Sequence, residues 1–370
     1  MPLKIKTAIR FGQNYIQPFR QTLKILPNWS IIRKTNKMSE EKVHIIAEAG
    51  TNHNGNFSTA KKLVDIAVKA KADSVKFQII YPEGLYLPGV YEFGHYDILK
   101  VVEMRRRFML TDKNYLQLDE YCRKKKIAFS ASVFDKRGAD LLAGMNPPFI
   151  KIASTDLNNF RLLRIVAEKG IKMILSTGMS TLSQVEKSVN ELYKSGFDKI
   201  VLMHCVSAYP ARLEEMNLGF IDALRTSFGF PVGLSDHTQG SIAACMALTK
   251  KISYIEKHYT IDHTQEGFDH LYAFEEDQFI EYVDNIRKAE EALSFQGSKL
   301  KKDELYVKKR ARRSLYAARA MKKGEVIKDK DVMVVRPEGI MDASEIDLII
   351  GKKLNRNIKL YEPFSPDMIS

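Results

Sequence analysis

The feature that most constrains the fold is an alternation of short apolar runs with amphipathic helical stretches, which begins at His44 and repeats eight times. Such runs are typical of parallel strands, because helices cover the sheet and both strand faces are buried. Eight β-then-α units over about 250 residues predict an α/β protein built on a TIM (β/α)8 barrel. We expect the strands at His44–Gly50, Ser74–Gln78, Ile127–Val133, Phe149–Ser154, Met173–Met179, Ile200–Ser207, Pro231–His237 and Tyr254–Thr260.

Helical patterns fall between these runs. The stretch Ser58–Ala70 places Leu63, Val64 and Ala67 on one side, and we expect Ser58 to be its N-cap. An open doubly wound sheet is the alternative architecture, but no G-x-G-x-x-G follows the first strand, so the barrel is favoured. Further helices are predicted at Thr111–Lys126, Thr181–Ser195 and Glu275–Leu293.

The composition and the predicted secondary structure of the chain change after the last predicted helix. A basic stretch, Lys299–Arg313, precedes three short β-prone segments at Ser314–Ala318, Val332–Val335 and Leu348–Ile350. Turn signals separate these segments, which indicates a small β-rich second domain. We therefore divide the chain into a basic extension (1–42), the barrel (43–295), a basic linker (296–312) and the second domain (313–370).

The net charge of +13 raises the question of nucleic-acid binding. Residues 1–37 hold eight basic residues and no acidic one, and Lys299–Arg313 holds eight basic and two acidic residues. The rest of the chain is close to neutral, so we expect no nucleic-acid partner. The first 37 residues are either a membrane-surface or targeting segment, or a stretch before the real start at Met38.

Three widely spaced cysteines, Cys122, Cys205 and Cys245, predict no disulfide framework and favour a reducing, cytoplasmic location. No apolar run approaches the roughly 20 residues of a membrane-spanning helix. We do not expect Cys205 to be a nucleophile, since it would face away from its neighbour His204. His53, His263 and His270 fall in loops and are expected to be solvated.

Polar side chains stand at the carboxyl ends of all eight predicted strands, where barrel enzymes build their active sites. A buried polar group without a partner costs about 1–3 kcal/mol, so a ligand is the expected partner of so many. The strand ends supply Glu48, Lys76, Gln78, Ser130, Ser132, Lys151, Ser154, Asp156, Ser176, His204, Ser207, Ser235, Asp236, His237, Glu256, Lys257 and His258.

Two lysines on these strands, Lys76 and Lys151, need anionic partners. With the neighbouring serines they are a candidate cradle for a phosphate or carboxylate. The alternative without a function is that each lysine forms a structural ion pair with Glu48 or Asp156. A second functional alternative is that one of the lysines forms a Schiff base with the substrate.

Two histidines end the seventh and eighth strands, so their imidazoles can converge on one divalent metal ion. These are His237 and His258, with Glu256 and Asp269 as further ligands or as groups binding a metal-bound water. The alternative is a pair of hydrogen-bonded core histidines.

A set of motifs in this order closely resembles the N-acetylneuraminate (sialic acid) synthase family. They are Ile-Ile-Ala-Glu-Ala-Gly-Thr-Asn-His-Asn-Gly (45–55), Val-Lys-Phe-Gln (75–78), Lys-Ile-Ala-Ser (151–154), Leu-Ser-Thr-Gly-Met (175–179), Gly-Leu-Ser-Asp-His-Thr (233–238) and Glu-Lys-His-Tyr-Thr (256–260). The C-terminal part resembles that family's antifreeze-like (SAF, β-clip) domain through Lys-Lys-Gly-Glu (322–325), Arg336-Pro337 and Ile-Gly-Lys-Lys-Leu (350–354).

The resemblance implies condensation of phosphoenolpyruvate with an N-acetylmannosamine-type aldose, in a domain-swapped homodimer with a Mn²⁺-type ion (Mg²⁺ or Co²⁺ as alternatives). It assigns phosphoenolpyruvate to Lys76, Ser132, Lys151, Ser154, Ser176, Ser207 and Ser235. Metal binding falls to His237 and His258, and catalysis to Glu48, Asp156 and Glu256. Sugar contacts fall to Gln78, Tyr209, Asp269 and, from the partner subunit, the residue equivalent to Arg336.

The sequence departs from the family's pattern at Asp156, where Glu is common, at Ser207, where Asn is frequent, and in Pro-Glu-Gly after Arg336. These changes leave the identity of the sugar substrate undecided. The alternative functions are a legionaminic or pseudaminic acid synthase and an N-acylneuraminate-9-phosphate synthase. Two further alternatives are a synthase of a shorter 3-deoxy keto acid and a catalytically inactive carbohydrate-binding scaffold.

Overall fold

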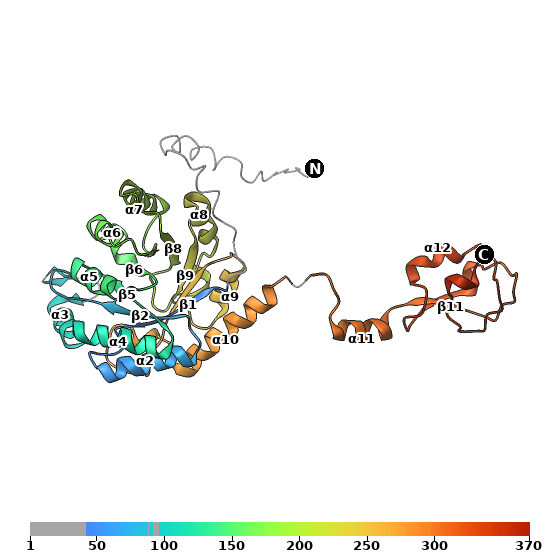
Figure 1. Ribbon diagram of the computed structural model, residues 1–370, viewed down its shortest axis with the longest axis horizontal. Coiled ribbons are helices and arrows are strands. Elements are labelled where there is room, and N and C mark those ends of the chain that lie inside the picture. Colours follow the sequence, from blue (N-terminus) through green and yellow to red (C-terminus); the bar gives the residue numbers. More distant parts are fainter. Residues whose placement is uncertain (1–41, 88, 92–95, 296) are drawn as a thin grey trace, which may run out of the picture. The chain divides into compact units, whose positions relative to one another are not determined.

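Eight parallel strands close into a barrel in the first part of the chain (Figure 1). The hydrogen-bonded order is β1-β10-β9-β8-β7-β6-β5-β2, and β1 pairs with both β2 and β10, which closes the sheet. The predicted TIM barrel is confirmed. The strands are β1 (His44–Gly50), β2 (Ser74–Ile79), β5 (Ala128–Val133), β6 (Ile150–Ile152), β7 (Met173–Ser176), β8 (Ile200–Cys205), β9 (Val232–Asp236) and β10 (Tyr254–His258).

The computed structural model describes residues 42–370, apart from residues 88, 92–95 and 296. The expectations for the N-terminal extension, including Met38 as a start, therefore lie outside the described residues except for Lys42. The chain divides into two units, one ending at Leu293 and one running from Ser294 to Ser370.

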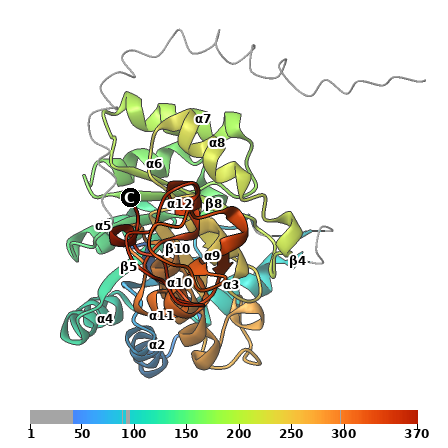
Figure 2. The ribbon, with the colours of Figure 1, turned by 90° about the vertical axis from the view of Figure 1, so that its right-hand side faces the viewer.

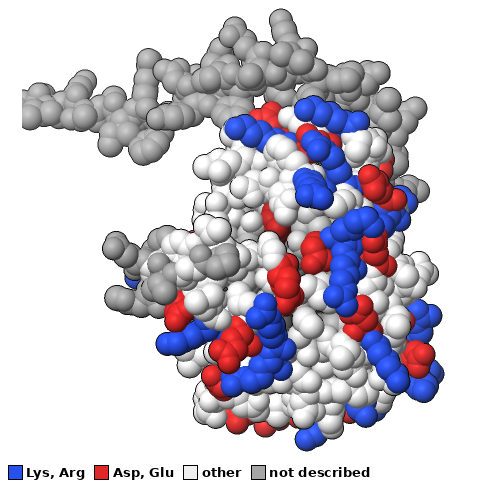
Figure 3. All heavy atoms as spheres, turned by 90° about the vertical axis from the view of Figure 1, so that its left-hand side faces the viewer, with Lys and Arg blue, Asp and Glu red and all other residues white. Residues whose placement is uncertain are grey.

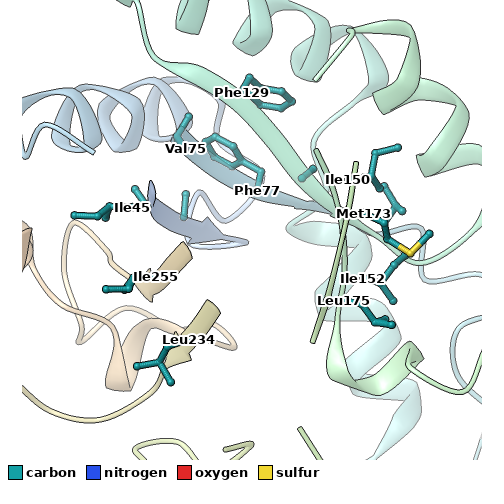
Figure 4. Packing of buried hydrophobic residues seen from close by; sticks show 14 of the residues in the cluster. Ile45, Val75, Phe77, Phe129, Ile150, Ile152, Met173, Leu175, Leu234 and Ile255 are labelled. Carbon is teal, nitrogen blue, oxygen red and sulfur yellow. The ribbon is translucent and has the colours of Figure 1, made fainter. Parts of the chain in front are cut away.

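Successive side chains along each barrel strand point alternately outward and inward, and this produces two separate apolar layers. Outward-facing residues pack between the sheet and the helices. Those labelled in Figure 4 are Ile45, Val75, Phe77, Phe129, Ile150, Ile152, Met173, Leu175, Leu234 and Ile255. A smaller cluster of Ile46, Phe149, Ile174, Val201 and Met203 forms from residues of the opposite parity, inside the barrel. Both layers are fully or almost fully buried.

Helices cover the outside of the barrel, and α6, α7 and α8 lie side by side along one flank (Figures 1 and 2). The expected Ser58 cap is wrong: Asn56 caps α2, and its side chain accepts from Thr59 N at 3.0 Å. The helices are α2 (Phe57–Lys69), α4 (Asp112–Lys125), α5 (Lys136–Gly144), α6 (Phe160–Ala167), α7 (Leu182–Lys194), α8 (Gly219–Phe228), α9 (Ile242–Leu248) and α10 (Glu276–Leu293).

The connection from β2 to β5 holds more than the usual single helix. A short hairpin of β3 (Val90–Tyr91) and β4 (Tyr96–Asp97) leads into α3 (Ile98–Arg107), which precedes α4. The last turn of α3 contacts the loop after β1, where a Cβ at Gly55 would lie 2.7 Å from Arg107 O. This insertion therefore lies at the carboxyl end of the barrel strands.

The second unit has a core of its own and a short antiparallel sheet of β11 (Ser314–Ala317) and β12 (Val332–Val335). The expected β-prone segment Leu348–Ile350 is instead largely in the helix α12 (Ile346–Ile349). Part of the expected linker forms helix α11 (Lys302–Ala311), which is tied to the rest of this unit by an ion pair of 2.8 Å between Lys308 and Glu338.

Basic and acidic side chains alternate over the face of the molecule shown in Figure 3, with no stretch of one sign. Over the part of the chain that the structure describes, no helix is both long and apolar enough to span a bilayer.

Candidate active site at the carboxyl end of the barrel

The inward-facing side chains change from apolar to polar toward the carboxyl ends of the strands. On β1 the inward residue after Ile46 is Glu48, and on β7 the residue after Ile174 is Ser176. The apolar cluster thus closes the barrel below, and polar side chains with little exposure fill its upper part.

Lys76 of β2 lies at the centre of this polar layer and is 2% exposed. Its Nζ lies 2.6 Å from Glu48 Oε2 and 3.5 Å from Glu256 Oε2, and donates to Ser132 Oγ at 2.8 Å. Gln78, the next inward residue on β2, donates to Glu48 Oε1 at 2.9 Å. The ion-pair interpretation of Lys76 therefore holds in the free protein, with two carboxylates rather than one.

Lys151 of β6 shares one of these carboxylates. Its Nζ donates to Ser176 Oγ at 2.6 Å and lies 3.8 Å from Glu256 Oε1. Ser235 of β9 donates to the same Glu256 oxygen at 3.0 Å. Two lysines and two glutamates thus form one buried, charge-balanced group with three serines on its edge.

The two carboxyl groups of this cluster have opposite pKa shifts. Burial, reinforced by the nearby charge of Glu256, raises the pKa of Glu48 to about 7 in spite of Lys76. Burial also opposes ionisation of Glu256, but Lys151 and Lys76 outweigh it and lower its pKa to about 2. Burial lowers the pKa of Lys151. Glu48 is therefore the member of the cluster that changes charge near neutral pH.

In the loop after β7, Gly178 packs its backbone against Ser154 and Ser207. Gly178 N donates to Ser154 Oγ at 3.1 Å. A Cβ at Gly178 would collide with Ser207 Oγ and lie 2.7 Å from Ser154 Oγ and 3.2 Å from Cys205 Sγ. Only glycine fits here, and the predicted serines Ser154 and Ser207 meet at this point.

The two predicted metal ligands, His237 and His258, lie next to each other with ring centroids 5.6 Å apart. His237 Nδ1 lies 2.8 Å from Val206 O, which orients the ring as metal-bound histidines are usually oriented. His258 Nδ1 and Asp269 Oδ2 are buried, lie 4.0 Å apart and have no hydrogen-bond partner among the residues that the structure describes. Burial lowers the pKa of His258 to about 4, which keeps it neutral, as a ligand must be.

These donors fit an ion that takes two imidazoles from the protein and its other ligands from Asp269, water or substrate. Within the described ranges, no group of three or more His, Cys, Asp or Glu side chains is already placed to hold a metal ion.

Two tyrosine rings, Tyr209 and Tyr272, pack beside the histidines. The Tyr209 ring lies 4.3 Å from that of His237 and 4.7 Å from that of Tyr272, centroid to centroid. Tyr272 OH donates to Asp269 Oδ1 at 2.6 Å. Tyr272 was not among the predicted site residues, because it lies in the long loop after β10 and belongs to no motif.

Of the predicted site residues, Asp156 makes its described hydrogen bonds to other side chains, and Arg336 belongs to the second unit. Asp156 is buried, but its side chain accepts from Thr155 Oγ1 at 2.9 Å and Asn159 Nδ2 at 3.0 Å. Arg336 follows β12 in the second unit and is exposed there. Both assignments stay predictions.

The assignment of β8 is reversed with respect to the sequence analysis. His204 has the outward parity, and its Nε2 lies 2.6 Å from Met216 O. Cys205 has the inward parity, and its Sγ lies 3.8 Å from His237 Nδ1 and 3.9 Å from Ser207 Oγ. Counting residues along the predicted strand does not show which of its two faces points into the barrel. The pairing of β8 with its neighbouring strands decides this.

The expectation that three loop histidines are solvated is wrong for two of them. His53 and His270 are each 1% exposed, whereas His263 is exposed. His270 Nδ1 lies 2.6 Å from Thr260 Oγ1, and its Nε2 lies 3.2 Å from Asn54 Oδ1. The loops after β1 and β10 therefore pack against each other at the rim of the site.

A second buried network lies on the outward side of the same strand ends. Lys257 Nζ lies 3.4 Å from Asp236 Oδ2, which also accepts from Tyr282 OH of α10 at 2.8 Å. Asp236 and Lys257 each directly precede one of the two histidines in sequence. The network thus ties β9, β10 and α10 together immediately behind His237 and His258.

Comparison with known proteins places the chain in a family. The model of the NeuB family matches residues 63–298, and that of the SAF domain matches residues 312–370. An uncharacterized protein of Methanocaldococcus jannaschii is 37% identical over 86% of this chain and 91% of its own length. The N,N'-diacetyllegionaminic acid synthase of Legionella pneumophila is 33% identical over 85% of this chain and 91% of its own.

A solved structure agrees with these matches. The N-acetylneuraminic acid (sialic acid) synthetase of Leptospira borgpetersenii, in complex with citrate, is 32% identical with a TM-score of 0.64. The match covers 72% of this chain and 90% of that one.

Proposed function

The chain belongs to the NeuB family and carries a SAF domain, and from that premise we propose that it is a nonulosonic acid synthase that condenses phosphoenolpyruvate with N-acetylmannosamine or a related 2-acetamido aldose. The observation that carries the proposal is the buried group of Lys76, Lys151, Glu48 and Glu256, edged by serines, beside a histidine pair. An anion-binding end and a metal-binding end thus adjoin in one barrel.

The lysine end suits phosphoenolpyruvate. Lys76 and Lys151 supply charge, and hydroxyl or backbone donors come from Ser132, Ser154, Ser176, Ser207 and Ser235. The lysines are neutralised by two carboxylates in the free protein, so an incoming anion is best accommodated when Glu48, with its pKa of about 7, takes up a proton.

The histidine end suits the aldose. Gln78, Tyr209 and Asp269 surround it with hydrogen-bonding groups and one aromatic face. His237 and His258 would hold a divalent ion, Mn²⁺ before Mg²⁺ or Co²⁺, which when bound supplies Lewis acidity toward the sugar aldehyde.

The reaction balances with the residues of this chain. C3 of phosphoenolpyruvate forms a bond to the aldehyde carbon, and protonated Glu48 gives its proton to the aldehyde oxygen. Water adds to C2 and loses a proton to Glu256 or Asp156. The C2–O bond to phosphate then breaks with its electron pair leaving on the phosphate, and the C2 hydroxyl passes its proton to the departing phosphate as C2 becomes a carbonyl. The lysines and serines stabilise the departing phosphate.

We also propose that the enzyme acts in the cytoplasm as a domain-swapped homodimer, in which Arg336 of one chain completes the sugar site of its partner. The cytoplasmic assignment rests on three unpaired cysteines, and the dimer rests on the family resemblance and on the position of Arg336 in a separate unit.

An aldose panel tests the function. The full chain with Mn²⁺ and phosphoenolpyruvate is incubated with N-acetylmannosamine, its 6-phosphate, diacetamido-dideoxy aldoses and short aldose phosphates. We expect phosphate release with a 2-acetamido aldose and a nine-carbon keto acid by mass spectrometry. A shorter product identifies the 3-deoxy keto acid alternative, and no release with any aldose favours the inactive scaffold.

Two controls sharpen this experiment. Bridging ¹⁸O in phosphoenolpyruvate should leave with phosphate, and its retention in the acid would exclude C–O cleavage. Chelation should abolish turnover and Mn²⁺ should restore it, so full activity after chelation removes the metal from the proposal.

A further inference from the structure

Three consecutive arginines form the last turn of α3, and two of them are paired. Arg106 Nε lies 2.8 Å from Glu83 Oε1, and Arg107 Nη2 lies 2.7 Å from Glu266 Oε2. Among the residues that the structure describes, no carboxylate lies within ion-pair distance of Arg105. Arg105 thus carries a charge that its described surroundings leave uncompensated.

Arg105 is nevertheless held in place. Its guanidinium carbon lies 3.5 Å from the centroid of the Phe268 ring, and its Nη1 donates to Thr51 Oγ1 at 3.3 Å. Its Nε is buried and has no hydrogen-bond partner in the described part of the chain. A guanidinium has five N–H donors, and the described surroundings orient this one by stacking and a single hydrogen bond.

Both contacts of Arg105 are next to residues proposed for the sugar. Phe268 directly precedes Asp269, and Thr51 directly follows Gly50. A Cβ at Gly50 would lie 2.8 Å from Asp269 Oδ2 and 3.3 Å from Gln78 Nε2. The two residues that hold Arg105 are therefore sequence neighbours of Asp269 and of Gly50, which lies against Asp269 and Gln78.

The loops that meet at Arg105 follow β1, β2 and β10, all at the active-site end of the barrel. In the proposed reaction the aldehyde of the aldose lies deep, next to the lysine–glutamate group where phosphoenolpyruvate would react. The opposite end of the sugar chain would then extend outward toward the rim, where these loops lie.

We propose that Arg105 binds an anionic group at the end of the aldose opposite its aldehyde, which makes a phosphorylated 2-acetamido aldose the preferred acceptor. A guanidinium held flat against a ring, with no carboxylate partner among the residues described around it, matches the planar two-point hydrogen bonding of a phosphate. This inference rests on the proposed function and specifies its substrate class.

The test compares N-acetylmannosamine with its 6-phosphate in the full-length, Mn²⁺-loaded enzyme at saturating phosphoenolpyruvate. We expect wild type to prefer the phosphorylated sugar. Arg105→Gln should lower kcat/KM for it about 10- to 100-fold, chiefly through KM, because a hydrogen bond between charged groups contributes about 1.5–3 kcal/mol. Activity on the unphosphorylated sugar and the KM for phosphoenolpyruvate should change less than about threefold.

Arg106→Gln is the matched control, since Arg106 is the next residue, exposed and already paired with Glu83. It should change neither sugar's kinetics. Thermal unfolding of each variant verifies folding, and Arg105→Lys, which keeps the charge without the planar fork, should lie between wild type and Arg105→Gln.

The outcomes separate this inference from the function on which it rests. If no aldose is condensed, the proposed function fails. If an aldose is condensed but wild type prefers the unphosphorylated sugar, or Arg105→Gln affects both sugars equally, the function stands and the role of Arg105 is overturned.

Discussion

At the scale of residues, the charge balance around Lys76 decides what the site can do. Lys76 lies between two carboxylates, and the second lysine reaches only Glu256. Glu48 is therefore the carboxylate of this cluster that takes up a proton first, near pH 7, whereas Glu256 stays ionised. A carboxyl group with a pKa of about 7 is suited to giving or taking a proton at physiological pH.

This predicts a pH dependence of stability. The folded-state pKa of Glu48 is above its ordinary value of 4.5, so its favourable contribution to folding is complete below pH 4.5 and is lost as pH rises through 7. Between pH 5 and 8, wild type should lose about 2 kcal/mol more free energy of unfolding than Glu48→Gln. Urea unfolding at each pH measures this.

The matched control is Glu83→Gln, which removes an exposed carboxyl group whose pKa is lowered by its hydrogen bond to Arg106. It should follow the wild-type pH dependence. A parallel course for wild type and Glu48→Gln would mean that Glu48 is ionised throughout this range.

At the scale of elements, all eight strands were predictable; β1 ends at Gly50 and β5 at Val133 as predicted, but the ends of the last five strands were not predicted correctly. All eight strands form where the apolar runs lie, because burial on both faces requires continuous apolar sequence. Strands β6 to β10 end one to three residues before the predicted position. The polar residues beyond those ends leave the sheet and turn over the site, as Ser154 and Ser207 do at Gly178.

The start of α2 tests an element boundary. Asn56→Ala should lower the free energy of unfolding by about 1 kcal/mol, since the Asn56 side chain satisfies the N–H of Thr59. Ser58→Ala, the change at the residue that the sequence favoured as the cap, should be neutral because Ser58 is exposed within the first turn. A larger loss for Ser58→Ala, measured by chemical denaturation, would contradict the cap assignment.

At the scale of the whole molecule, two units with separate hydrophobic cores share one chain. The barrel carries the lysines, glutamates and histidines, and the second unit carries Arg336. In the proposed dimer, therefore, each complete site draws on both chains.

Complementation tests the exchange of units. Lys151→Met and Arg336→Ala should each be nearly inactive, but co-assembled dimers should regain about one quarter of wild-type activity, because half are heterodimers with one complete site. A mixture of Lys151→Met and Glu256→Gln, two changes in the same barrel, should stay inactive. Absence of recovery in the first mixture, with heterodimers verified by two affinity tags, would exclude the swap.

The sequence by itself determined the barrel, the strands and the polar residue types that gather at their carboxyl ends, because period and burial leave few ways to arrange eight such units. It also identified both lysines and both histidines. Only the tertiary structure decided that Cys205 and not His204 has the inward parity, that Lys76 lies between two carboxylates, that Tyr272 contacts Asp269, and that Arg105 contacts the loop after β1. Strand pairing and loop packing set these contacts, and neither is encoded in local sequence period.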